Sequence, residues 1–132
     1  MAKRKNDSQK LAELVAKAMD DKKASDIRIL DLREIKSAVT DYFIICHAQS
    51  STQVQAIADN IDYLVKKMTG NDPIGTEGYQ NAEWILVDYA DVVAHVFNEE
   101  KRMFFGLEKL WGDAKVKKVI SKETNIKSDL DF

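Results

Sequence analysis

The chain has 132 residues, of which 45% are hydrophobic and 32% are charged, so it is long enough for one domain with a single core and leaves little room for a second. This composition excludes a disordered protein, and no apolar run approaches the roughly 18 residues of a membrane-spanning helix. The basic start of the chain is followed by no apolar run, so we expect no secretory signal there. The single cysteine, Cys46, cannot form a disulfide framework, and we expect a cytoplasmic protein.

The overall charge of −2 averages two regions of opposite sign. The segment Ser37–Glu100 holds ten acidic residues and only two cations, Lys66 and Lys67, which gives it a net charge of −8, and the rest of the chain carries +6. An acidic surface repels phosphates and attracts basic proteins. We therefore expect a basic protein as partner, with RNA contact that is at most peripheral.

The first half of the chain shows two helical patterns and two strand patterns. Residues 8–23 place apolar side chains on one helical face, and residues 26–32 alternate as a strand does. The apolar run at residues 42–46 has no alternation, which is typical of a central strand covered on both faces. The sequence then predicts a helix over residues 50–69, begun by a capping-box pattern at Ser50 and ended by Gly70.

The second half predicts a short strand at residues 75–77 and a hairpin. Residues 83–89 and 92–97 read as two strands joined by Ala90 and Asp91 alone, a spacing that requires antiparallel pairing. Asn98 then caps a third helix that Gly112 closes. We expect an α/β domain over residues 1–112, with a mixed sheet of about five strands and helices on both faces, and a polar tail over residues 113–132 that begins as a helical stub.

Motifs for catalysis are weak. No glycine-rich phosphate-binding loop is present. Cys46, His47 and His95 lack the compact spacing of a metal site, and a Cys46–His95 nucleophile pair is possible only if the fold brings them together. Asp88 and Asp91 could hold Mg²⁺ for nucleotidyl transfer, but a spacing of three across a turn favours a structural role. We expect no cofactor and no enzymatic activity.

An ordered set of motifs resembles the ribosomal silencing factors, also called the Iojap family. The matching segments are Leu30–Leu32, Thr40–Cys46, Gln53 with Ala56–Ala58, Glu77–Gly78, Trp84–Tyr89, Asp91–Phe97, Arg102, Phe105, Leu107–Glu108 and Leu110–Trp111. One departure is the run His47–Ser50, where the family often has a Ser-Gly pair before its serine.

This resemblance implies a nucleotidyltransferase-like fold without the catalytic motif. It also implies binding to protein number fourteen of the large ribosomal subunit, at the face that meets the small subunit. Subunit joining would then be blocked and translation repressed, chiefly when nutrients are limiting. Family members are commonly homodimers, so a homodimer is possible here.

We place the predicted partner contact around the hairpin because polar and aromatic residues that match the family gather there. The predicted contact residues are Glu77, Trp84, Asp88, Tyr89, Asp91, His95 and Arg102. Two alternatives stay open at this point, namely a metal-dependent nucleotidyltransferase that uses Asp88 and Asp91, and an assembly factor for the large subunit.

Overall fold

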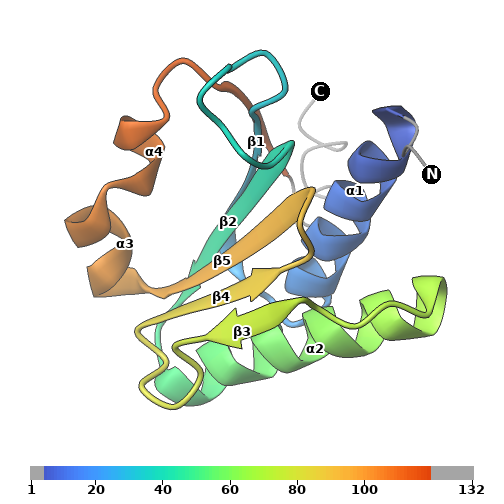
Figure 1. Ribbon diagram of the computed structural model, residues 1–132. Coiled ribbons are helices and arrows are strands. Elements are labelled where there is room, and N and C mark those ends of the chain that lie inside the picture. The colour runs from blue at the N-terminus through green and yellow to red at the C-terminus, as the bar shows by residue number, and fades with distance from the viewer. Residues whose placement is uncertain (1–4, 120–132) are drawn as a thin grey trace, which may run out of the picture.

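The computed structural model describes residues 5–119, which form one sheet with helices on both sides (Figure 1). In chain order the elements are α1 (Lys5–Asp21), β1 (Ser25–Asp31), β2 (Tyr42–Ala48), α2 (Ser51–Thr69), β3 (Gly75–Glu77), β4 (Trp84–Asp88), β5 (Val92–Asn98), α3 (Glu99–Phe105), α4 (Leu107–Leu110) and β6 (Lys115–Lys118). None of the helices in this part of the chain is long and apolar enough to cross a membrane.

The sheet has six strands in the order β3-β4-β5-β2-β1-β6. The neighbours β2 and β5 run parallel, and every other pair is antiparallel, so the sheet is mixed as predicted. The predicted hairpin is confirmed by the pairing of β4 with β5, in which Trp84 faces Phe97 and Asp88 faces Val93. β2 lies near the centre, as its unbroken apolar run predicts.

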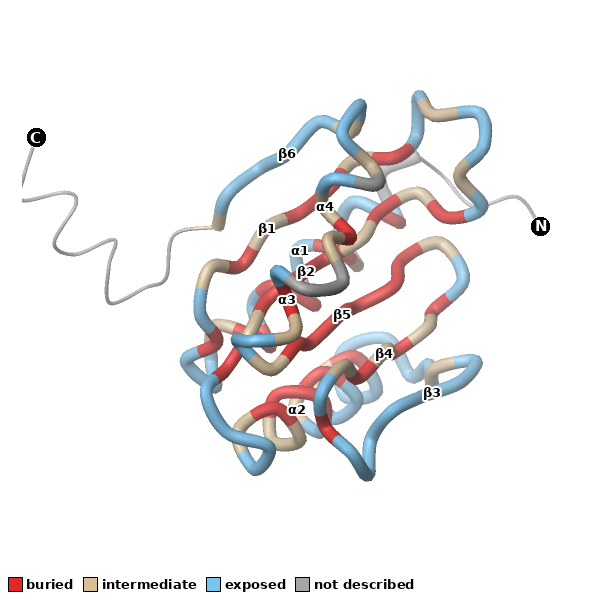
Figure 2. Tube along the Cα trace, turned by 90° about the vertical axis from the view of Figure 1, so that its left-hand side faces the viewer, coloured by how far each residue is buried: buried red, intermediate tan, exposed pale blue. Residues whose placement is uncertain are grey.

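The two faces of the sheet are covered unequally. Both long helices, α1 and α2, pack on one face over a large apolar cluster that includes Met19, Ile44 and Ile57. On the opposite face, α3 and α4 cover a smaller cluster that includes Ile45 and Phe97. Figure 2 shows α3 and α4 in front of the β1 and β2 side of the sheet, with β3, β4 and the outer part of β5 left uncovered.

Local signals set the limits of the best-predicted helix, α2. The Ser50 side chain accepts a hydrogen bond from the Gln53 amide, and Gly70 ends the helix with φ at 80°. The left-handed conformation costs little free energy at a glycine, because glycine has no Cβ that would clash with the preceding turn. Both predicted boundary residues are therefore confirmed.

Two predictions for the end of the chain are wrong. The third helix is not continuous, because Gly106 adopts φ of 60° and separates α3 from α4. The expected helical stub after residue 113 is instead the strand β6, which pairs with β1 and adds a sixth strand. Alternation in Lys115–Lys118 is hard to detect because all four residues are exposed. The remainder of the predicted tail, residues 120–132, lies outside the described residues.

Candidate functional site

The uncovered part of the sheet is the candidate site. Strand residues that pair side by side point to the same face, and the register aligns Glu77 with Leu86 and places Asp88 beside Val93. Trp84 lies further along the same strand face, since it is two residues from Leu86. Here we call this surface, formed by Glu77, Trp84, Leu86 and Asp88, the open face.

Trp84 is the partly exposed aromatic residue of the open face, and contacts with His95 and Phe97 hold its ring in place. Its indole Nε1 donates a hydrogen bond to His95 Nδ1 at 2.9 Å. The ring also stacks on Phe97, with centroids 5.0 Å apart. A large aromatic side chain held in one orientation loses little conformational freedom on binding, which suits it to anchor a protein interface.

His95 itself is buried, with 3% of its surface exposed. Because Nδ1 accepts a hydrogen bond from the indole N–H of Trp84, the ring is neutral with its own proton on Nε2. Within the described residues, Nε2 has no hydrogen-bond partner, and the ring meets Phe43 edge to face at 4.6 Å. His95 thus positions Trp84, and it is not itself on the surface.

Asp88 and Asp91 belong to the hairpin turn. Asp88 Oδ1 accepts a hydrogen bond from the Ala90 amide at 2.7 Å, and Ala90 has φ of 71°. The Asp91 carbonyl accepts bonds from the Asp41 and Tyr42 amides. The structure therefore gives both residues the turn role that their spacing favours. Among residues 5–119, no group of three or more His, Cys, Asp or Glu side chains could hold a metal ion.

Two predicted contact residues lie away from the open face. Tyr89 is buried on the α2 side of the sheet, where burial and then Asp62 and Asp72 raise the pKa of its hydroxyl. Arg102 is buried on α3, beside β1 and β2. The structure thus brings Glu77, Trp84 and Asp88 together on one face, and His95 is buried beside Trp84. Tyr89 and Arg102 lie apart from them.

Arg102 is the centre of a charged network that attaches α3 and α4 to the sheet. Its Nη1 donates to the Asp26 carbonyl at 2.7 Å and lies 2.9 Å from His47 Nδ1. Its Nε and Nη2 bind both carboxylate oxygens of Glu108, at 3.0 and 3.2 Å. Asp26 sits in a bulge of β1 with φ of 47°, so an irregular strand presents the carbonyl that Arg102 needs.

Cys46 and His95 do not form a nucleophile pair. Parallel register pairs Cys46 with Val96 and Ile45 with His95, so the two side chains point to opposite faces of the sheet. Cys46 is fully buried, and burial raises the pKa of its thiol. A thiol in this environment packs as a small apolar side chain.

Both histidines make the protein less stable in acid. Burial lowers the pKa of His95 to about 3, and burial together with Arg102 lowers the pKa of His47, against 6.5 for the free side chain. Below pH 6.5 the unfolded chain therefore binds protons that the folded chain does not. The free energy of unfolding should fall by about 2 kcal/mol for His95 alone between pH 7 and pH 5.

The measurement is urea unfolding at half-unit steps between pH 5 and pH 7.5. A His95→Gln variant has no titratable group at this position and should show a correspondingly smaller slope of stability against pH, whatever its absolute stability. An identical slope in the variant and the parent would contradict the assignment of this acid sensitivity to His95.

Sequence reasoning missed two features. Leu86 belongs to the open face, and the two-residue period of a strand could have placed it there, on the same side of β4 as Trp84 and Asp88. No sequence signal could have found the Arg102 network, because its members lie on β1, β2, α3 and α4. Only the folded sheet brings them together.

The fold is a mixed α/β sheet with a partly exposed acidic and aromatic face. A sequence model described as "Ribosomal silencing factor during starvation" matches residues 5–131. The chain is 44% identical to ribosomal silencing factor RsfS of Bacillus subtilis over 129 residues, which cover 92% of each chain. It is also 44% identical to RsfS of Halalkalibacterium halodurans over 107 residues, covering 81% of this chain and 90% of the other.

Solved structures agree with these relatives. A crystal structure of a Chromobacterium violaceum protein superposes with a TM-score of 0.75 at 36% identity, and covers 79% of this chain and 85% of the other. This chain therefore belongs to the ribosomal silencing factor family, RsfS, which confirms the resemblance seen in its motifs.

Proposed function

We propose that this protein binds protein number fourteen of the large ribosomal subunit through its open face, blocks joining of the small subunit and so represses translation when nutrients are limiting. The observation that carries the proposal is the open face itself, an uncovered region of sheet with Trp84 held at one end of β4 and acidic residues beside it. This function requires steric exclusion and no catalytic residue. It places the protein in the cytoplasm, where the ribosomes are.

Charge supports a basic protein as the partner. Glu77 and Asp88 lie on the open face, and Glu83 precedes β4 directly. Carboxylates at this density repel phosphate groups, which makes RNA a poor partner for this surface, whereas they speed the encounter with a basic protein. Trp84 and Leu86 supply apolar area for the centre of the interface, and the acidic residues form its rim.

Co-sedimentation with isolated large subunits tests the proposal. Trp84→Ala removes the anchor and should weaken binding by at least about 30-fold, the effect typical of a central aromatic residue. The pair Glu77→Lys with Asp88→Asn should weaken binding most at low salt, where charge steers association. Asp88→Asn is chosen because its amide oxygen can still accept the Ala90 hydrogen bond.

A matched control changes the same amount of charge elsewhere. Asp7 on α1 and Asp113 before β6 are exposed and lie away from the open face, so Asp7→Lys with Asp113→Asn should co-sediment like the parent. Parent-like binding by Trp84→Ala would move the contact to another surface. A protein that binds large subunits but leaves a subunit-joining assay unaffected would remove the blocking role.

A further inference from the structure

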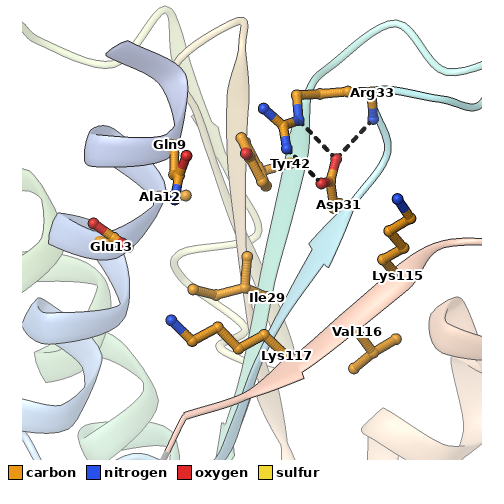
Figure 3. Close-up of a pocket in the computed structure, with 10 residues that line it drawn as sticks. All are labelled: Gln9, Ala12, Glu13, Ile29, Asp31, Arg33, Tyr42, Lys115, Val116 and Lys117. Atoms are coloured by element: carbon orange, nitrogen blue, oxygen red, sulfur yellow. Dashed lines mark hydrogen bonds and ion pairs between the residues drawn. The ribbon is translucent and has the colours of Figure 1, made fainter. Parts of the chain in front are cut away.

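A second site lies on the other side of the sheet, between α1 and the edge strand β6 (Figure 3). It is a cavity of about 190 Å³. Gln9, Ala12 and Glu13 of α1 form one wall, and Lys117 of β6 reaches toward α1 from the opposite wall. Ile29 and Tyr42 form the floor. This cavity is larger than the roughly 150 Å³ cavity that holds benzene in an engineered protein.

The most informative group in the cavity is the hydroxyl of Tyr42. Tyr42 has only 4% of its surface exposed, and Figure 3 shows its hydroxyl directed toward Gln9 across the cavity. This hydroxyl makes no hydrogen bond to another described residue, and its oxygen keeps contact with solvent through the cavity. Burial raises its pKa, and the Asp31 carboxylate adds to the effect while Arg33 opposes it, so the group is a neutral donor. A donor that opens into a cavity from an otherwise buried side chain, with no partner among the described residues, is free to bind a ligand there.

Arg33 provides a second donor beside this hydroxyl. Its Nε and Nη2 bind the two oxygens of Asp31 at 3.0 and 2.8 Å, and its guanidinium lies over the Tyr42 ring, 5.1 Å from the centroid. These contacts fix the guanidinium in place. They leave Nη1 unused, and Figure 3 shows that nitrogen on the cavity side. A fixed arginine nitrogen next to a hydroxyl donor is well suited to bind a carboxylate.

The remaining groups specify the rest of the ligand. Glu13 is exposed, makes no ion pair with another described residue, and lies on the α1 wall of the cavity. An ammonium group would satisfy it. Ala12 and Ile29 offer an apolar surface between the two charged ends of the cavity. The cavity therefore presents donors for a carboxylate, an acceptor for an ammonium group and a surface for an aliphatic side chain.

We propose that this cavity binds a free aliphatic α-amino acid. The carboxylate lies against the Tyr42 hydroxyl and Arg33 Nη1, the ammonium group faces Glu13, and the side chain packs on Ile29. A simple anion would lie beside the carboxylate of Glu13, and a simple cation would meet Arg33 and Lys117. The cavity lies on the α1 face of the sheet, and the open face lies on the opposite face. Amino-acid binding in the cavity can therefore be tested independently of ribosome binding.

The test is a calorimetric or NMR titration of the full chain with L-leucine. We expect saturable binding of one molecule per chain. Leucinamide, which lacks the carboxylate, and N-acetylleucine, which lacks the ammonium group, should each bind about tenfold or more weakly, because each removes a charge-assisted hydrogen bond.

Tyr42→Phe is the decisive variant because it removes one oxygen atom and keeps the ring. It should weaken leucine binding about tenfold or more. Tyr63→Phe is the matched control, since Tyr63 is exposed on α2 and outside the cavity, and it should bind leucine like the parent. Glu13→Gln should reduce the preference for leucine over N-acetylleucine. The proposal is overturned by a lack of saturable binding up to tens of millimolar leucine, by equal affinity for leucinamide, or by parent-like binding in Tyr42→Phe.

Discussion

An Arg102→Leu variant is expected to lose about 3–5 kcal/mol of unfolding free energy, the cost typical of removing one partner from a buried ion pair. Arg102 has 6% of its surface exposed and binds the Glu108 carboxylate, the Asp26 carbonyl and His47. Its removal leaves the Asp26 carbonyl, held in a strained bulge, without its donor. Among the described residues, Glu108 then keeps only the half-buried Arg28 as a charged partner, at 3.3 Å. The docking of α3 and α4 on the sheet should weaken with it.

Urea unfolding at pH 7.5 measures this loss, and Arg33→Leu provides the control. Arg33 also binds a carboxylate with two nitrogens, but its side chain is 37% exposed, so the control should lose about 1 kcal/mol or less. Arg102→Lys should rescue little, because an ammonium group cannot reproduce the planar fork that serves Glu108 and Asp26 together. Equal losses in the two leucine variants would show that the network contributes no more than a surface ion pair.

A Gly78→Ala variant should lose about 3 kcal/mol, for two reasons that act together. Gly78 has φ of 79°, and a Cβ at this position would lie 2.1 Å from the Trp84 carbonyl oxygen. The left-handed conformation alone costs a residue with a Cβ about 1–2 kcal/mol. The overlap with a backbone atom adds to this, because it can be relieved only by moving the loop after β3 away from β4.

Gly70→Ala separates these two causes. Gly70 has nearly the same φ, 80°, but a Cβ there would meet no atom within 4 Å. It should therefore lose only about 1 kcal/mol in the same thermal or urea unfolding experiment. Similar losses at both positions would show that the contact with Trp84 contributes nothing, and that only the backbone conformation matters.

Local rules accounted for most of the fold. The cap at Ser50, the stop at Gly70 and the cap at Asn98 act within four residues, so the sequence contains the whole signal. The hairpin was equally local, because its two strands are joined by a few residues. Long-range features were not predictable in this way. The strand β6 forms by pairing with the edge of β1, which lies far from it in sequence. Its exposed lysines show no apolar alternation.

The candidate site was predicted in part for the same reason. Glu77, Trp84 and Asp88 share one face of neighbouring strands, which the short loops between them already imply. Tyr89 is adjacent to Asp88 in sequence yet points to the other face, as every second strand residue does. Arg102 was grouped with the site because it matched the family pattern, and its position depends on how α3 packs against β1 and β2.

The central parallel pair has a consequence for how the chain reaches its native state. β2 and β5 are separated by the whole of α2, β3 and β4, so the middle of the sheet closes only after a loop of more than forty residues has been ordered. Contacts of such long sequence separation form slowly compared with hairpins and helices. During synthesis on the ribosome, the first half of the chain, α1 to α2, emerges before β5. One edge of β2 therefore stays unpaired until β5 has been synthesised. The apolar run Tyr42–Cys46 is therefore the segment of this protein most exposed to aggregation before folding is complete.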